Sequence, residues 1–263
     1  MNPSTRYDAM FTRLQERGEI AFIPFAMVGD PDLEASEALI EALIEAGADA
    51  LELGIPFSDP IADGPTIQAA ATRALSAGVR PTHALELIAR VRARHPELPI
   101  GLLVYANLLM SAGVPRFYAR CAEAGVDSVL VADVPTREAP PFSQAARAVG
   151  IHPVLIATPN IPDATLTQLA ERSSGYTYVV TRAGVTGARD TLASDLSTLV
   201  TRVRDSGAPP PVLGFGISQP DHVRAARAAG AAGAISGSAV VSAALEGGPE
   251  AAAEFVRSMK AAT

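Results

Sequence analysis

The chain of 263 residues has little lysine and little cysteine, two side chains that many enzymes use to form covalent intermediates. Its single lysine, Lys260, lies in the C-terminal tail, and its single cysteine is Cys121. A substrate carbonyl therefore cannot be held as a Schiff base on a core strand. One cysteine excludes an internal disulfide and is typical of a reducing compartment. Cys121 lies in a helical pattern, where we expect a small buried apolar side chain.

Histidine is also scarce, and the four histidines are scattered. His83, His95 and His222 fall in helical stretches, and His152 precedes a strand. No two of them have the spacing of metal ligands, so we expect packing or surface roles for all four. The sequence therefore lacks the histidine ligands that metal-assisted enolate chemistry would need. We predict no metal ion and no cofactor in this chain.

Long hydrophobic runs and excess positive charge are missing as well. No stretch approaches the ~20 apolar residues of a membrane span, and the N-terminus lacks the apolar run of a signal peptide. The net charge is −7 and the pI about 5.1, which argues against nucleic acid or an anionic membrane as a partner. With 48% hydrophobic residues, the sequence predicts a globular cytoplasmic protein that can still bind a small anion.

What the chain does have is eight short apolar runs, each followed by a helical pattern. Continuous apolar strands alternating with helices predict a parallel sheet covered by helices. Eight such units fit an α/β fold of the (β/α)8 TIM barrel type, with an extra N-terminal helix over 4–18 and one domain spanning 1–263. A doubly wound open sheet is the alternative, but it needs fewer strands and a reversal of strand order. The eight runs are residues 20–28, 48–54, 100–105, 128–132, 154–157, 176–181, 212–216 and 234–236.

The stretch 50–68 carries the least ordinary pattern. Glu52 lies between Leu51 and Leu53, so a strand here has a leucine face and a face with a carboxylate. Burial of an ionised carboxylate is costly, and a site that tolerates it favours a raised pKa and an acid/base role, with a structural carboxylate as the alternative. Prolines stiffen the loop that follows, so Asp63 is held in place, as a second acid or as a turn former. Asp59 before Pro60 is equally compatible with loop shaping and with a partner contact.

Other polar and glycine residues fall at the predicted C-terminal ends of strands, where barrel enzymes hold their active sites. Tyr176 and Tyr178 lie on the sixth strand, and we expect only one of them to face the interior. Glycine-bearing loops after the last three strands predict a phosphate pocket built from backbone N–H groups and at most the Ser238 hydroxyl. The chemistry that remains is cofactor-free general acid/base catalysis by carboxylates on a phosphorylated substrate. The strand-end residues also include Tyr105, Asn107, Asp133, Arg182, Thr186, Ser218, Gly184, Gly187, Gly214, Gly216 and Gly237.

Residues 51–68 read LELGIPFSDPIADGPTIQ and closely resemble the signature of the tryptophan synthase alpha subunit family. The resemblance continues in order through residues 22–32, 99–108, 125–135, 175–188 and 214–241, and so covers nearly the whole chain. It implies a (β/α)8 barrel that cleaves indole-3-glycerol phosphate to indole and glyceraldehyde 3-phosphate by a retro-aldol reaction. It also implies an α2β2 complex in which indole passes to a beta subunit that carries pyridoxal phosphate and makes L-tryptophan from L-serine.

The resemblance assigns roles by motif position. Glu52 matches the glutamate that shuttles protons, Asp63 the aspartate that holds the indole N–H, and Tyr178 a tyrosine beside the glutamate. Tyr178 is therefore taken as the inward-facing residue of its pair. The remaining matches are Phe25, Leu103, Tyr105 and Ile156 in the indole pocket, Gly187, Phe215, Gly216, Gly237 and Ser238 at the phosphate, Thr186 on a lid that contacts Asp63, and Pro56 and Asp59 facing the partner.

Two positions depart from the family pattern. Met27 stands where threonine or serine is expected near the indole pocket, and Arg189 stands where the lid often carries an acidic residue. Two other readings stay open. One is a non-catalytic phosphate-binding barrel that acts as an allosteric partner. The other is a different phosphate-binding barrel, such as a ring-forming synthase or a sugar isomerase, although the synthase requires barrel lysines that this chain lacks.

Overall fold

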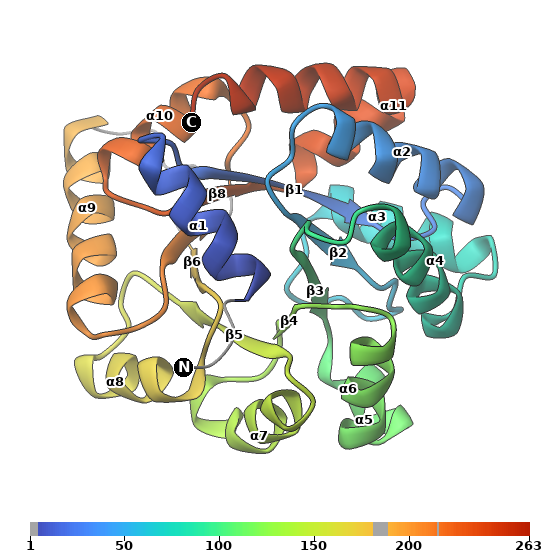
Figure 1. Ribbon diagram of the computed structural model, residues 1–263, viewed down its shortest axis with the longest axis horizontal. Helices are drawn as coiled ribbons and strands as arrows, with labels where there is room; N and C mark the ends of the chain where they lie inside the picture. The colour runs from blue at the N-terminus through green and yellow to red at the C-terminus, as the bar shows by residue number, and fades with distance from the viewer. Residues whose placement is uncertain (1–4, 181–188, 215) are drawn as a thin grey trace.

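The computed structural model of the chain describes residues 5–180, 189–214 and 216–263. Eight parallel strands close into a barrel in sequence order, with β1 paired to both β2 and β8 (Figure 1). The (β/α)8 barrel predicted from the sequence is confirmed, and the open-sheet alternative is excluded. The strands are β1 (Ala21–Met27), β2 (Leu51–Gly54), β3 (Ile100–Val104), β4 (Ser128–Val131), β5 (His152–Ala157), β6 (Thr177–Val180), β7 (Pro211–Gly214) and β8 (Gly233–Ser236).

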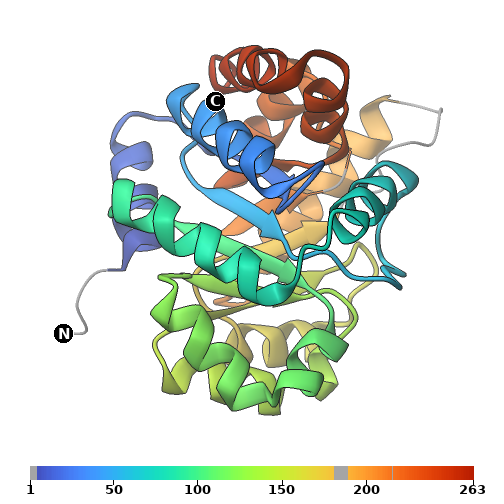
Figure 2. The same cartoon turned by 90° about the vertical axis from the view of Figure 1, so that its right-hand side faces the viewer.

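Helices surround the barrel, as the view turned by 90° shows (Figure 2). None of the described helices is long and apolar enough to cross a membrane. The helices are α1 (Arg6–Glu16), α2 (Leu33–Glu45), α3 (Pro65–Ser76), α4 (Pro81–Arg94), α5 (Ala106–Ala112), α6 (Val114–Glu123), η1 (Thr136–Glu138), α7 (Pro140–Ala148), α8 (Asp163–Arg172), α9 (Arg189–Asp205), α10 (Pro220–Ala228) and α11 (Ser238–Lys260).

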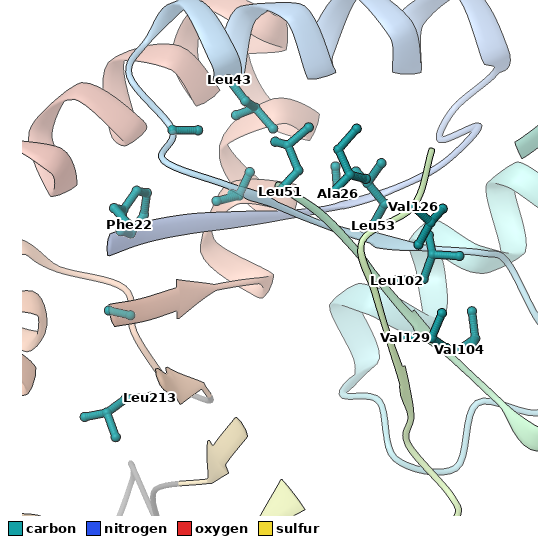
Figure 3. Close-up of a cluster of buried hydrophobic side chains, with 14 of the residues drawn as sticks. Phe22, Ala26, Leu43, Leu51, Leu53, Leu102, Val104, Val126, Val129 and Leu213 are labelled. Carbon is teal, nitrogen blue, oxygen red and sulfur yellow. The ribbon is translucent and has the colours of Figure 1, made fainter. Parts of the chain in front are cut away.

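Side-chain alternation along the strands separates two apolar layers. Leu51 and Leu53 of β2 point outward and pack with Leu43 of α2 in the core between barrel and helices (Figure 3). Because successive side chains on a strand point to opposite faces, Glu52 points into the barrel. The leucine face and the carboxylate face predicted for this strand are both present.

The extra N-terminal helix α1 lies across the end of the barrel where the strands begin (Figure 1). Its Tyr7 is 1% exposed and belongs to the interior cluster with Tyr176 and Tyr178. The Tyr7 hydroxyl and Ser128 Oγ, at the start of β4, are 2.8 Å apart and hydrogen-bonded. This helix therefore closes the floor of the barrel and leaves the other end, where the strands finish, for a site.

Three local features differ from or refine the sequence pattern. Helix α5 follows β3 directly and was not expected, and its first amide, of Ala106, donates to Asp133 Oδ1 at 2.8 Å. The segment between β4 and β5 forms two pieces, η1 and α7, which meet next to Pro140. Helix α11 is interrupted at Gly247 and at Gly248, whose φ of 70° is a left-handed conformation that favours glycine.

Candidate active site

Glu52 lies inside the barrel and is 1% exposed. The pKa of its carboxyl is raised to about 8, chiefly by burial and also by the nearby Asp63 carboxylate, against a hydrogen bond from Tyr176 that lowers it. That hydrogen bond runs from the Tyr176 hydroxyl to Glu52 Oε1 at 3.1 Å. A carboxyl poised near neutral pH can both donate and accept a proton, which is the property expected of an acid/base group.

Asp63 lies at the end of the loop from β2 to α3, half-buried beside the barrel mouth. Its amide donates to the Pro60 carbonyl at 3.0 Å, and its carbonyl accepts from Gln68 Nε2 at 2.7 Å. These contacts fix the loop backbone, so the carboxyl is positioned as the prolines predicted. Burial raises the pKa of Asp63, and a hydrogen bond with Tyr105 lowers it.

Tyr105 braces this loop from the neighbouring strand. It follows β3 directly, and its hydroxyl accepts a hydrogen bond from the Ala62 amide at 3.1 Å. Its ring stacks on Phe57, with centroids 5.4 Å apart and an interplanar angle of 23°. Tyr105 therefore links the loop that carries Asp63 to the body of the barrel, a role that its position in the sequence did not reveal.

The prediction for Tyr176, which directly precedes β6, and Tyr178, which lies on it, requires a correction. We expected only one of them to face the interior, but Tyr176 and Tyr178 are two residues apart and both belong to the interior cluster. Residues i and i+2 on a strand share a face, so that expectation was wrong. Tyr176 rather than Tyr178 bonds to Glu52. Tyr178 lies above it, across Gly214, where an added Cβ would be only 2.2 Å from the Tyr178 hydroxyl oxygen.

An apolar surface surrounds the two carboxyls at the barrel mouth. Phe25 is paired in register with Glu52 on the adjacent strand, and Ile156 is paired with Tyr178. Leu103 on β3 is paired with Gly54. Phe25 is buried, whereas Leu103 and Ile156 are partly exposed although they belong to strands of a closed barrel. Accessible apolar side chains of this kind can contact a flat aromatic ring placed over Glu52.

The glycine loops follow β7 and β8, and β8 is paired with β1, the strand that carries Phe25. Gly216 follows β7 with a φ of 79°, and Gly237 precedes Ser238, the first residue of α11. A Cβ added to Gly237 would lie 3.8 Å from Phe25 Cβ, so this loop borders the apolar surface. The buried Ser236 hydroxyl donates to the Ile217 carbonyl at 2.6 Å and ties the two loops together. Free backbone amides at a helix N-terminus suit an anion such as phosphate.

Five residues that the sequence analysis names lie outside the described residues: Arg182, Gly184, Thr186, Gly187 and Phe215. The two predicted partner contacts lie in the loop after β2, where Pro56 is buried and Asp59 is exposed, with Ser58 Oγ donating to Asp59 Oδ2 at 2.5 Å. Exposed apolar side chains occur on the same rim. Ile61 is 82% exposed in this loop, and Met110 is 63% exposed on α5.

Comparisons with known proteins show which family the chain resembles. Residues 11–262 match the family model described as tryptophan synthase alpha chain. The chain is 58% identical over 236 residues to a tryptophan synthase alpha chain of Escherichia coli strain SMS-3-5, which covers 90% of this chain and 88% of that protein. It is 56% identical, with the same coverage, to the alpha chain of Shigella dysenteriae serotype 1.

Solved structures show the same fold. The tryptophan synthase alpha subunit of Legionella pneumophila superposes with a TM-score of 0.90 at 28% identity and 98% coverage of both chains. A chain from the tryptophan synthase α2β2 complex of Pyrococcus furiosus superposes with a TM-score of 0.83 at 38% identity, covering 91% of this chain and 97% of that one. From the length of the family match, the identities and the common fold together, this chain belongs to the tryptophan synthase alpha chain family.

Proposed function

We propose that this chain is the lyase that cleaves indole-3-glycerol phosphate to indole and D-glyceraldehyde 3-phosphate, a retro-aldol reaction. The observation that carries the proposal is the fully buried Glu52, whose pKa of about 8 is set by burial and by the nearby Asp63. Cleavage needs one proton removed from the glycerol hydroxyl next to the ring and one delivered to indole C3. A single carboxyl that exchanges protons near neutral pH can do both.

In the proposed mechanism Glu52 begins protonated and delivers its proton to indole C3. The ring nitrogen then carries positive charge, which the Asp63 carboxylate stabilises through a hydrogen bond from the N–H. Glu52, now ionised, takes the hydroxyl proton as the carbon–carbon bond breaks. The bond electrons return to the ring and release indole, and the hydroxyl carbon becomes the aldehyde. The proton balance closes, since Glu52 ends protonated as it began.

The rest of the site positions the substrate. We assign the indole ring to the apolar surface formed by Phe25, Leu103 and Ile156, with Tyr105 holding the loop of Asp63. The phosphate is assigned to the amides at Gly216, Gly237 and Ser238 at the mouth. Tyr178 lies between these two regions, beside Glu52 and Asp63. The assignments of Gly187 and Phe215 to the phosphate, and of Thr186 to a lid, remain predictions.

A beta subunit is the proposed partner. The Pyrococcus furiosus neighbour comes from a structure described as an α2β2 complex. On this chain the exposed Asp59, Ile61 and Met110 form a mixed polar and apolar rim beside the active-site mouth, which suits contact with another protein better than with water. In this proposal pyridoxal phosphate belongs to the beta subunit, which uses the released indole, and this chain acts without a cofactor.

Product analysis tests the proposal. The purified chain is incubated with indole-3-glycerol phosphate, with and without a beta subunit, and indole and glyceraldehyde 3-phosphate are quantified separately. We expect equal amounts of the two products and faster release with the beta subunit. A chain that stimulates a beta subunit but forms neither product would instead be a non-catalytic partner, and would reject the lyase assignment.

A further inference from the structure

A cavity of about 240 Å³ lies just outside the barrel, next to the mouth. Its walls come from the loop after β1, from α2 and α3, and from both sides of the interruption in α11. Most lining residues are apolar, and the charged side chains of Asp30 and Arg73 form a two-bond ion pair at 2.6 and 2.7 Å. The mechanism proposed above uses none of these groups.

Met27 belongs to both this cavity and the barrel interior. It is the last residue of β1, it lines the cavity, and it is 4% exposed. It lies two residues after Phe25, so both side chains point toward the barrel mouth. The two also share one apolar cluster, together with Val241 of α11. The Met27 side chain therefore stands between the predicted indole surface and the outer cavity.

Gly54 shows how closely these side chains pack. A Cβ added to Gly54 would lie 2.7 Å from Phe25 Cζ and 3.0 Å from Met27 Cε. The end of the methionine thus fills, beside the phenyl ring, space that any larger residue at position 54 would occupy. Gly54 is also paired in register with Leu103, which borders the same surface. The tip of Met27 is part of the wall of the aromatic site.

We propose that Met27 determines specificity at the aromatic end of the substrate. Its thioether closes the site against the outer cavity, so that an unsubstituted indole ring fits and a ring carrying an extra group on this side does not. The inference rests on the proposed function and adds to it the residue that sets the size of the accepted ring. Methionine suits this position because it is apolar and unbranched and fills irregular gaps.

The volume of the outer cavity limits the size of the substituent that it could accept. Liquid water occupies roughly 30 Å³ per molecule, so a cavity of about 240 Å³ has room for a methyl, chloro or methoxy group. Shortening Met27 would join this space to the aromatic site. The cavity lining is mostly apolar and includes Val241, Ala244 and Leu39, so an apolar substituent needs no new hydrogen bond there.

The test uses the condensation of indoles with glyceraldehyde 3-phosphate, which reverses the proposed cleavage and joins indole C3 to the aldehyde carbon. The probes are indole and its 4-, 5-, 6- and 7-methyl and chloro derivatives. We expect Met27→Ala to raise kcat/KM for at least one substituted indole, relative to indole, by about tenfold over the wild-type ratio. Met27→Val should give a smaller gain, and Met27→Leu, which keeps the volume, should give none.

Two filling variants separate this explanation from general loosening of the site. Ala244→Leu on α11 and Ala35→Leu on α2 add volume to the lining of the cavity from two helices and keep good helix formers. Combined with Met27→Ala, each should cancel the gain for the substituted indole while leaving condensation of indole itself in place. A gain that survives both filling changes would show that the substituent does not enter this cavity.

The outcomes distinguish this inference from the function on which it rests. Suppose that the wild-type chain condenses indole, but Met27→Ala and Met27→Val lower kcat/KM for every probe by the same factor. The specificity role is then wrong, and the lyase assignment stands. If the wild-type chain condenses no indole at all, the proposed function itself is rejected, and the specificity role with it. Should Met27→Ala fail to fold, Met27→Val carries the same comparison.

Discussion

The Tyr176 hydroxyl donates a hydrogen bond to Glu52 Oε1 at 3.1 Å, in the interior of the barrel. Both residues are buried, and the Tyr176 ring contacts Tyr7 of α1, with centroids 5.5 Å apart. The donor stabilises the ionised carboxylate, so it opposes the burial that raises the pKa of Glu52. The pKa of Glu52 thus reflects burial and the nearby Asp63 carboxylate, which raise it, and the Tyr176 hydroxyl, which lowers it.

Removal of that phenol should shift the pH dependence of activity. Tyr176→Phe deletes the one hydrogen bond that lowers the pKa of Glu52. We expect the limb of the kcat/KM profile that belongs to Glu52 to move to higher pH by about one unit, which corresponds to ~1.4 kcal/mol of lost interaction. Tyr178→Phe is the matched control, since Tyr178 makes no hydrogen bond that changes the pKa of Glu52. An unmoved limb in Tyr176→Phe would show that this hydrogen bond does not set the pKa.

Glu52 should also make stability depend on pH. Its folded pKa of about 8 lies above the ordinary value of 4.5, so the folded chain holds an extra proton between these pH values. The stability associated with that proton is fully present below about pH 4.5 and is lost as pH rises through 8. Glu52→Gln lacks this titration, so its free energy of unfolding minus that of wild type should rise by about 4 kcal/mol between pH 5 and pH 9. Urea unfolding at several pH values measures the difference, and parallel curves would contradict it.

Tyr105 should act through the loop that carries Asp63. Tyr105→Phe removes the acceptor of the Ala62 amide and the hydrogen bond to Asp63. We expect kcat/KM for indole-3-glycerol phosphate to fall about tenfold, because a loss of ~1.4 kcal/mol in positioning is tenfold in rate, while stability changes by ~1 kcal/mol or less. Phe57→Leu is the matched control, since it removes the ring stacking but leaves the hydroxyl in place. Equal losses in the two variants would mean that ring packing, not the hydroxyl, orders the loop.

The single lysine should matter for stability. Lys260 Nζ lies 3.0 Å from Glu19 Oε2 and 3.0 Å from Oδ2 of Asp49, whose side chain is 6% exposed. Lys260→Met removes a positive charge that balances the buried Asp49 carboxylate. We therefore expect a loss of about 2 kcal/mol in free energy of unfolding. Arg257→Met removes two exposed ion pairs on the same helix and should cost ~0.5 kcal/mol or less. Thermal and urea unfolding of the two variants compares them directly. Equal losses in the two variants would indicate that the ion pair with buried Asp49 stabilises the fold no more than the exposed pairs do.

Much of the fold was predictable because it depends on local patterns. The eight apolar runs and the helices between them required a parallel barrel, and the position of Glu52 between Leu51 and Leu53 required an inward carboxyl. The resemblance to a family then supplied the substrate. That residues 1–263 form one domain remains a prediction.

The parts that sequence could not supply depend on contacts between distant segments. The bond from Tyr176 to Glu52 spans 124 residues, and the bond from the Ala62 amide to Tyr105 spans 43. Helix α5 is short, and its first amide is satisfied by Asp133, from the next loop. The error over Tyr176 was different in kind. Alternation along a strand was enough to place Tyr176 and Tyr178 on one face, and the signal was misread.

The central claim is that Glu52 moves the proton in the cleavage of indole-3-glycerol phosphate. The direct measurement is the rate of indole formation by wild type and Glu52→Gln under saturating substrate, in the same complex with a beta subunit. Glutamine keeps the size and can donate to Tyr176 or accept from it, but cannot exchange a proton. We predict a loss of about 10³-fold or more in kcat, with binding of a phosphorylated ligand retained. Wild-type turnover by Glu52→Gln would contradict the account.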